Sequence, residues 1–521
     1  MFRVTLFTLI SLFFYLFDIG NLDGVRQGTE ALYIQIAKEM AEANSVLVPL
    51  YRGEPHWSKP PLQFWFGMVF IKAFGEFSLA VTRSSMVFLS FVSSLYLAKI
   101  LKSIYRIKTI DTLVLLLGCF GTLKFSRTFM MEVPLMFLPL ISMYKYFQYS
   151  QSAKRVDLFI SFFLGALAVL VKGPISIVMA VLSLGTYLIF EYIKDKKIYF
   201  RFKTNLIFFT GIFLTSSVWF LLCYNEYGSE FFRYFFIREN VGKFHQVDMP
   251  MRRIVEGIIM FCFPWLILIP SFFRGLLKAK KLTKFQLFSL ACFLGHFLIW
   301  FVPKQRSHHY AIPSLGFFII FSYSLLPKKL KKLDLGVGSL SSILVFIVAS
   351  ICLYFSTTVG QFFWGISSLS FSGLAICFLF KEGLRRSLVL LAISFFILWS
   401  TCIPVFFIPL VPADVIGYIN KDPSKTVVVN DRRSFFFEQF LDRRVKVITA
   451  GEIEKNLKEG NSVITSHSRL FGKVIDDKFV TFRWLKWIRK PDRMVVLKAF
   501  KNRNLDILKE NVYLLEKDEK N

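Results

Sequence analysis

Charged residues are scarce in this chain, and acidic residues are the scarcest of them. Of 521 residues only 19% are charged, and 64 lysines and arginines stand against 35 aspartates and glutamates. Soluble domains carry about 25% charged residues, whereas this chain is 55% hydrophobic and has a mean hydropathy of +0.53. These values exclude an ordinary soluble enzyme, a disordered chain, a collagen and a coiled coil. They indicate a protein embedded in a membrane.

Paired cysteines are also missing. The seven cysteines lie within or at the edges of apolar segments, and no two form a Cys-x-x-Cys motif. We interpret them as small buried hydrophobic residues, with neither a disulfide framework nor a metal site. The 63 phenylalanines present more aromatic surface than one water-exposed core can hide, and a bilayer can accommodate it.

The net charge of +29 would suggest a nucleic-acid partner in a soluble chain. Here the lysines and arginines cluster in short loops between apolar segments, which is typical of the cytoplasmic side of a membrane protein, so no nucleic acid is expected. The apolar segments predict thirteen spans: 4–16, 82–100, 110–124, 134–149, 157–171, 174–192, 206–223, 255–273, 285–302, 310–326, 337–356, 362–380 and 387–409.

The basic loops predict the orientation of the spans. With the N-terminus inside, six basic loops all fall on the cytoplasmic side: 102–108, 154–155, 194–197, 278–281, 328–332 and 385–386. The first span has no small-residue cleavage site after it and is expected to be retained. The apolar segment 62–76 would invert every later loop if it crossed, so we expect an interfacial helix on the outer face.

The composition changes sharply after residue 411. The transmembrane domain is expected at 1–411, and 412–521 is expected to form a small α/β domain outside. Its predicted strands are 426–429, 445–449, 462–465 and 494–497, and its predicted helices are 435–441 and 451–457. Two outer loops, 18–81 and 224–254, are long, and long loops usually carry function. The chemistry is therefore expected on the outer face.

The first outer loop holds two candidate motifs. In segment 28–33 (GTEALY), Glu30 would lie in the first turn of a helix, where the dipole keeps a carboxylate ionised. That carboxylate could accept a proton or orient a hydroxyl, or it could simply cap the helix. In segment 57–61 (WSKPP), the prolines hold Lys59 extended. Lys59 could bind a phosphate at the interface or merely snorkel toward water.

Further polar residues occur at the lips of spans. Glu132 is an acid at the edge of an apolar segment, which is costly unless it is used or paired, and Arg127 is one possible partner. Lys172 in segment 172–174 (KGP) is either a functional cation or part of a tight turn. Segments 238–244 (RENVGKF) and 304–310 (KQRSHHY) are charged and could both be solvated. Adjacent histidines make a weak metal site, because they point in different directions.

In this order, the motifs resemble the polytopic lipid-phosphate-dependent glycosyltransferases of the GT-C fold, in particular the bacterial aminoarabinose (lipid A) transferases and the protein O-mannosyltransferases. The resemblance covers about 18–320. It rests on 29–40 (TEALYIQIAKEM), 59–65 (KPPLQFW) with 74–75 (FG), 132–135 (EVPL), 172–174 (KGP), 235–242 (FFIRENVG), 264–265 (PW) and 306–313 (RSHHYAIP). The expected thirteen spans and outer C-terminal domain also resemble the aminoarabinose transferases.

The resemblance implies an inverting sugar transfer at the periplasmic face of a bacterial inner membrane, from a polyprenyl-phosphate sugar donor to a hydroxyl of a lipid A-like lipid or a protein. It implies a multi-pass protein among membrane lipids, with no certain cofactor and a divalent metal possible. The implied roles are catalysis by Glu30 and Glu132, donor phosphate binding by Lys59, Arg238, Lys172 and Arg306, and substrate binding by Tyr33, Trp57, His308, His309 and Tyr310.

The chain departs from the family pattern at several acids. Thr29 stands where the family has Asp, Glu132 stands for a second Asp, Leu32 replaces an Arg, and Ser58 replaces a Glu. Two other functions therefore remain open: a transporter or flippase of lipid-linked sugars, and a GT-C scaffold without catalysis. The absence of an internal repeat and of paired broken spans argues against a transporter.

Overall fold

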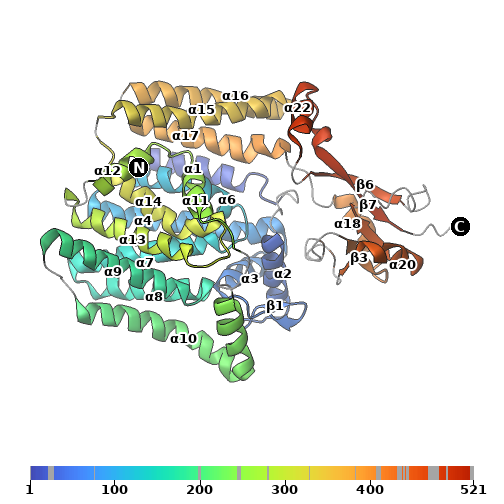
Figure 1. Ribbon diagram of the computed structural model, residues 1–521, viewed down its shortest axis with the longest axis horizontal. Helices are drawn as coiled ribbons and strands as arrows, with labels where there is room; N and C mark the ends of the chain where they lie inside the picture. Colours follow the sequence, from blue (N-terminus) through green and yellow to red (C-terminus); the bar gives the residue numbers. More distant parts are fainter. Residues whose placement is uncertain are drawn as a thin grey trace.

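In the computed structural model the chain forms a bundle of helices with a sheet domain at one end (Figure 1). The structure describes residues 2–20, 28–75, 77–196, 201–242, 248–277, 281–327, 329–381, 383–406, 412–430, 437, 441, 445–466, 480–488 and 491–516. One hydrophobic core runs through the whole bundle, and the sheet domain has two smaller cores of its own.

Every predicted span contains helix. The bundle consists of α1 (Phe2–Leu16), α4 (Leu79–Tyr105), α5 (Thr109–Leu117), α6 (Phe120–Ser126), α7 (Glu132–Ser152), α8 (Arg155–Lys172), α9 (Ile175–Asp195), α10 (Phe202–Phe232), α11 (Arg252–Cys262), α12 (Leu268–Leu277), α13 (Lys284–Leu298), α14 (Ile312–Ser324), α15 (Lys332–Tyr354), α16 (Val359–Phe380) and α17 (Leu384–Ile397). Short 3-10 and π segments extend some of them: η5 (Ile299–Phe301), η6 (His308–Ala311), η7 (Leu398–Cys402) and η8 (Ile403–Phe406).

Two predicted spans are broken helices. α5 and α6 meet at an angle of 68°, and a cis Phe263–Pro264 bond lies between α11 and α12. Among the described residues, seven helices are long and apolar enough to cross a membrane, or eight if the bent pair is one span. α1 is short, with 15 residues, and α8 carries three charged residues. The chain is a multi-span membrane protein, and the count of thirteen stays a prediction.

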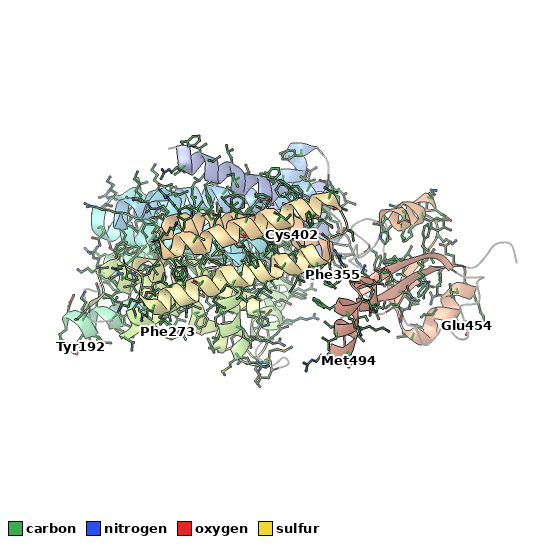
Figure 2. All side chains as sticks on the ribbon, turned by 90° about the horizontal axis from the view of Figure 1, so that it is seen from above. Tyr192, Phe273, Phe355, Cys402, Glu454 and Met494 are labelled. Atoms are coloured by element: carbon green, nitrogen blue, oxygen red, sulfur yellow. The ribbon has the colours of Figure 1, made fainter. Side chains whose placement is uncertain are left out.

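The bundle has two different ends. Figure 2 places Tyr192 and Phe273 at one end and Phe355 and Cys402 toward the sheet domain at the other. The first is the end where the described parts of the six basic loops lie, and we call it the basic end. The second, which carries α2, α3 and the sheet domain, is called the loop end.

Ion pairs join neighbouring helices at the basic end. Lys145 of α7 binds Asp157 of α8 at 2.8 Å, and Arg274 of α12 binds Asp334 of α15 at 2.7 Å. The guanidinium of Arg385 on α17 contacts both carboxylate oxygens of Asp111 on α5. Each acid lies in the first turn of a helix, where the helix dipole favours a negative charge.

The first outer loop is folded against the bundle. α2 (Gly28–Glu42) lies across the loop end (Figure 1), and a hairpin of β1 (Leu50–Tyr51) and β2 (Glu54–Pro55) follows it. The indole nitrogens of Trp65 and Trp219 donate to the carbonyls of Val46 and Leu47, both at 2.7 Å. α3 (Leu62–Phe74) packs on α2, α4 and α8, at the position expected for the interfacial helix.

The second long loop is a continuation of α10. The backbone at Gly228 has φ 61° and ψ −148°, outside the helical region, and a left-handed φ of this kind favours glycine. The chain therefore turns there and continues as the π-helix η2 (Arg233–Val241). This turn brings the end of η2 to the first outer loop.

A five-stranded mixed sheet forms the C-terminal domain, in the order β4-β3-β5-β7-β6. Its elements are α18 (Ala413–Lys421), β3 (Val427–Asn430), β4 (Lys446–Ile448), η9 (Ala450–Glu452), α20 (Ile453–Lys458), β5 (Ser462–Thr465), β6 (Val480–Trp487), α22 (Arg493–Lys501), η11 (Leu505–Leu508) and β7 (Lys509–Leu515). Val427 and Val429 join the core that contains α18 residues, and Val428 joins the core that contains α20 residues. The alternation of a strand thus gives the sheet two covered faces.

Three of the four strands predicted in this domain are confirmed as β3, β4 and β5. The strand predicted at 494–497 is wrong, because those residues belong to α22, whose N-terminus is capped by the Asp492 side chain accepting from the Met494 amide. The predicted helix 435–441 lies almost entirely outside the described residues. β6 and β7 were not expected.

The sheet domain contacts the bundle through α22. The Tyr354 hydroxyl donates to the Phe500 carbonyl at 3.0 Å, and the rings of Phe355 and Phe500 meet edge to face at 5.0 Å. Arg503 donates to the Tyr354 carbonyl and stacks on its ring. Arg52 of the first outer loop also reaches the Val445 carbonyl, at 3.4 Å.

Candidate active site

Glu132 lies at the centre of a buried cluster at the loop end. It begins α7, is only 3% exposed, and interacts electrostatically with Lys172 of α8 and Lys124 of α6. His309 Nε2 lies 3.7 Å from Glu132 Oε1, too far for a hydrogen bond, and Oε2 has no hydrogen-bond partner among the described residues. A buried carboxylate with an open oxygen and two cations nearby is poised to bind a polar group.

Lys172 occupies an aromatic corner. Its ammonium lies 4.6 Å from the ring centre of Trp300 and 4.5 Å from that of Tyr310. Gly173 follows with φ 84°, which favours glycine and ends α8 directly after the lysine. These cation–π contacts fix the position of the ammonium and leave its positive charge in place. The turn expected for segment 172–174 and a fixed cation are therefore both present.

His309 is neutral at pH 7. Burial, and then the positive charges of Lys172 and Lys124, lower the pKa of His309 to about 3. Its Nδ1 is hydrogen-bonded to Ser307 Oγ at 2.8 Å, which fixes the ring, and its edge meets Tyr310. A neutral imidazole beside Glu132 can exchange a hydrogen bond with a substrate hydroxyl.

A second cluster contains Lys59. Its ammonium donates to Glu239 Oε2 of η2 at 3.1 Å and to the Ser58 carbonyl at 2.6 Å, and its side chain is 15% exposed. His56 and Ser58 are hydrogen-bonded beside it. Burial, then the charge of Lys59, lowers the pKa of His56 to about 4, against the opposing effect of Glu239. The Lys59–Glu239 pair therefore ties the two long outer loops together.

Trp57 anchors this cluster on the second outer loop. Its ring packs edge-on against Tyr227, Phe231 and Tyr234, with ring centres 5.5 to 6.3 Å apart. Its indole nitrogen is buried, and no described residue accepts a hydrogen bond from it. The contacts of Trp57 are those of a packing residue, with one donor left for a ligand.

Tyr33 lies between the two clusters. It is 5% exposed and packs edge to face on Phe64 at 5.4 Å. Burial raises the pKa of Tyr33 well above its usual value, and the nearby Glu132, Tyr310 and Glu239 raise it further. Groups from the first loop, α7, η6 and η2 thus meet around one phenol. Four segments far apart in the sequence therefore place titratable groups near Tyr33.

Glu30 is not exposed at this site. Its carboxylate is fully buried, accepts from Arg83 Nε of α4 at 2.8 Å and from the Phe129 amide at 2.9 Å. Arg83 also donates to the Ile19 carbonyl at 2.9 Å. These contacts connect α2 and α4 to the segment that precedes Glu132. They support a positioning role for Glu30 more than the catalytic role that the sequence predicts.

Arg127 and Arg306 both donate their hydrogen bonds to other groups of the protein. Arg127 does not pair with Glu132; it donates to the carbonyls of Phe14, Tyr15 and Phe17 and to the Ser400 hydroxyl. The guanidinium of Arg306 is 6% exposed and donates to Asp248 and to the carbonyls of Met249 and Phe301. Both arginines fix neighbouring segments, so the contacts of Arg306 favour an anchor over a phosphate ligand.

Arg238 and His308 lie at the surface. The guanidinium of Arg238 stacks on the Tyr234 ring at 5.1 Å, and its side chain is exposed. His308 is 41% exposed and lies 3.1 Å from a Glu256 carboxylate oxygen. Neither touches the buried cluster around Glu132. Arg238 is adjacent in sequence to Glu239 and so lies beside the Lys59 cluster.

Sequence reasoning missed Arg83, Lys124 and Glu239. Arg83 and Lys124 are single cations within apolar segments, and a charge at membrane depth is itself a signal of function or pairing. Glu239 follows Arg238 directly, in the charged segment 238–244. The sequence alone does not distinguish it from a solvated surface charge. Among the described residues, no group of three His, Cys, Asp or Glu side chains could hold a metal ion.

An apolar cavity of about 460 Å³ lies between α8, α9 and α10. Its lining includes Val169 and Pro174, on either side of Lys172, together with Phe231 and Phe236. The lining carries almost no polar surface.

A family model and several known proteins resemble this chain in sequence. Residues 58–219 match the family model of dolichyl-phosphate-mannose-protein mannosyltransferases. An uncharacterised protein of Aquifex aeolicus is 28% identical over 368 residues, covering 69% of this chain and 71% of that protein. The undecaprenyl phosphate-alpha-4-amino-4-deoxy-L-arabinose arabinosyl transferase 2 of Proteus mirabilis is 22% identical over 322 residues, covering 59% of this chain and 57% of that protein.

Solved structures agree on the architecture. The apo structure of ArnT from Cupriavidus metallidurans superposes with a TM-score of 0.72 at 13% identity, covering 98% of this chain and 97% of that one. The same protein bound to undecaprenyl phosphate gives a TM-score of 0.70, with 98% of both chains covered. The chain therefore has the GT-C fold of a polytopic membrane protein, and its resemblance to the polyprenyl-phosphate-dependent glycosyltransferases is confirmed.

Proposed function

We propose that this protein transfers a sugar from a polyprenyl-phosphate donor to a hydroxyl of a lipid A-like lipid or a protein, at the periplasmic face of a bacterial inner membrane. The observation that carries the proposal is the buried Glu132 with the half-buried Lys172, Lys124 and His309 around it, in a GT-C fold that also has an apolar cavity lined by Val169 and Pro174. An acid and cations at one point suit a reaction that moves a proton and releases an anion.

The donor would lie with its tail in the apolar cavity and its phosphate near Lys172. That cation is held by Trp300 and Tyr310 but keeps its charge for an anionic ligand. Lys59 would contribute a second cation, and Arg238 a third from the rim of the second outer loop. Charge builds up on the phosphate as the sugar departs, so fixed cations stabilise the transition state more than the bound donor.

Glu132 would act as the general base. The acceptor hydroxyl oxygen attacks the anomeric carbon, the bond from that carbon to the phosphate oxygen breaks, and the hydroxyl proton passes to the free Glu132 oxygen. Inversion follows because the attack comes from the side opposite the phosphate. His309, Tyr33 and Tyr310 would orient the acceptor, and Glu30 would hold the segment before Glu132 in place. The phosphate is the leaving group, so no nucleotide is required.

A transfer assay with purified protein tests the proposal. The protein in lipid vesicles is given polyprenyl-phosphate donors of several sugars, with lipid A and peptide acceptors, and the products are weighed by mass spectrometry. A glycosylated acceptor in any combination supports the proposal. Donor that crosses the bilayer without product indicates a flippase, and protein that does neither across the panel indicates a scaffold. Both of these outcomes would overturn it.

A further inference from the structure

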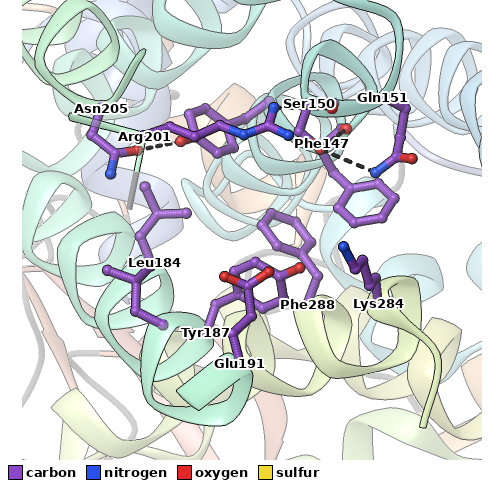
Figure 3. Close-up of a pocket in the computed structure, with 12 residues that line it drawn as sticks. Phe147, Ser150, Gln151, Leu184, Tyr187, Glu191, Arg201, Asn205, Lys284 and Phe288 are labelled. Atoms are coloured by element: carbon purple, nitrogen blue, oxygen red, sulfur yellow. Dashed lines mark hydrogen bonds between the residues drawn. The ribbon is translucent and has the colours of Figure 1, made fainter. Parts of the chain in front are cut away.

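A second cavity, of about 350 Å³, is shown in Figure 3. It lies at the basic end of the bundle, where α7 and α9 end and α10 and α13 begin, whereas Glu132 begins α7 at the other end. It is formed by α7, α9, α13 and the beginning of α10. Its volume falls in the range of small-molecule sites, about 300–1,000 Å³. Its polar lining comprises Tyr146, Ser150, Gln151, Tyr187, Glu191, Arg201, Asn205 and Lys284.

The walls of this cavity change from apolar to polar in one direction. On α9, Leu184, Leu188 and Glu191 share one helix face, with the acid nearest the basic end. On α13, Phe288 lies one turn deeper in the bundle than Lys284. The same gradient on separate helices fits an amphiphile whose polar head points toward the basic end.

Charges of both signs face each other across the cavity. Glu191 is 7% exposed, and no salt bridge joins it to a cation within the described part of the chain. Figure 3 shows Glu191 beside Tyr187 on one wall and Arg201 on the opposite wall. Arg201 donates to the Ser150 carbonyl at 3.0 Å, which aims its guanidinium along the rim. A buried carboxylate with no salt bridge to any described cation favours a cationic group in the cavity.

We propose that this cavity binds the headgroup of a zwitterionic phospholipid that carries a primary ammonium, as phosphatidylethanolamine does. The ammonium would pair with Glu191 against the Tyr187 ring, and the phosphate would lie between Arg201 and Lys284. An anionic lipid would meet the Glu191 carboxylate unfavourably, and a trimethylated ammonium could not donate hydrogen bonds to it. The site is separate from the proposed sugar transfer.

A lipid is favoured over a soluble phosphate compound because the cavity is flanked by lipid-facing side chains. Ile189 and Ile193 of α9 are 59% and 47% exposed, and Leu206 and Ile207 at the start of α10 are 53% and 50% exposed. These side chains project from the same two helices that line the cavity. Acyl chains could follow them while the headgroup occupies the polar rim.

Native mass spectrometry of the full-length protein tests the proposal. The delipidated protein is titrated with phosphatidylethanolamine, phosphatidylglycerol or phosphatidylcholine of identical chains, and separately with free phosphoethanolamine. We expect phosphatidylethanolamine to bind about tenfold more tightly than the other two lipids, and Glu191→Gln to abolish that preference. The matched control is Asp195→Asn, which removes an exposed acid one turn later on α9, outside the cavity.

A second pair of variants separates the phosphate from the ammonium. Arg201→Gln should weaken all three lipids alike, whereas Lys281→Gln, an exposed cation outside the cavity lining, should not. Equal binding of phosphatidylglycerol and phosphatidylethanolamine would overturn the proposal. So would a preference that survives Glu191→Gln, or free phosphoethanolamine that binds as tightly as the lipid. If Glu191→Gln does not fold, the lipid preference of the wild type and the effect of Arg201→Gln still test the proposal.

Discussion

Glu132 is a buried acid of the loop end that interacts with two cations, Lys172 and Lys124, and its Oε2 has no hydrogen-bond partner among the described residues. We expect Glu132→Gln to lower the turnover of sugar transfer by roughly 10²- to 10⁴-fold, the usual effect of removing a general base. The thermal unfolding temperature should stay near that of the wild type. The control is Glu226→Gln, an exposed acid on α10, which should transfer normally. Wild-type turnover in Glu132→Gln would remove it from the mechanism.

Glu30 differs from Glu132 because one of its carboxylate oxygens, Oε1, accepts from both Arg83 Nε and the Phe129 amide. Glu30→Gln removes the negative charge from a buried ion pair, and breaking such a pair typically costs about 3–5 kcal/mol of stability. We expect a lower unfolding temperature in detergent, and partial recovery in the double variant Glu30→Gln, Arg83→Met. An unchanged unfolding temperature together with lost transfer would instead make Glu30 the catalytic acid that the sequence predicts.

His56 gives the loop end a dependence on pH. Its pKa of about 4 in the folded protein lies below the ordinary histidine value of about 6.5, so the unfolded chain binds the extra proton between these values. Its contribution to stability is therefore complete above pH 6.5 and lost as the pH falls toward 4. Thermal unfolding at pH 7 and pH 4.5 should show a smaller drop for His56→Gln than for the wild type. Equal drops would contradict this assignment.

The two long outer loops act together because Lys59 and Glu239 join them. We expect Lys59→Ala and Arg238→Ala each to lower kcat/KM for the lipid donor by roughly 10- to 100-fold, since charge-assisted hydrogen bonds contribute about 1.5–3 kcal/mol. Acceptor KM should change little. Arg238→Lys should recover only part, because a point charge cannot make a bidentate contact.

Donor titrations at fixed acceptor measure these effects. If both residues bind one phosphate, the double variant should lose less than the product of the single losses. Unchanged donor kinetics in both single variants would assign the phosphate to Lys172, whose ammonium already faces the Glu132 cluster.

Much of the helical layout could be predicted from the sequence, because apolar length and basic loops are local properties. Pairings between distant elements could not. Arg83 and Lys124 appear in the sequence as isolated cations in apolar runs, and only the packing of α4 and α6 shows what each one meets. The valines at 495–496 suggested a strand, but the Asp492 cap starts a helix there. The two cations required knowledge of tertiary contacts, whereas at 494–497 a local helix cap outweighed the strand propensity of the valines.

The arrangement of the whole chain makes a prediction about sidedness. The sheet domain lies at the end opposite the basic loops, so it should face the periplasm (Figure 1). Cys377 is the exposed native cysteine, and the other six are buried. In a Cys377→Ser background, Lys455→Cys in the sheet domain should react with an impermeant thiol reagent in intact spheroplasts. Lys154→Cys, in a basic loop, should react only after lysis; the reverse pattern would invert the topology.

No residue of the candidate site lies beyond Tyr310, although the chain continues for 211 more residues. The last three helices of the bundle, α15 to α17, pack mainly on one another, and α15 carries the contact with α22. The chemistry and the outer appendage thus belong to separate stretches of the gene. A recombination event after α14 could therefore join the same site to a different outer domain. The buried carboxylate and its cations would be inherited unchanged, and the outer domain could bind different partners.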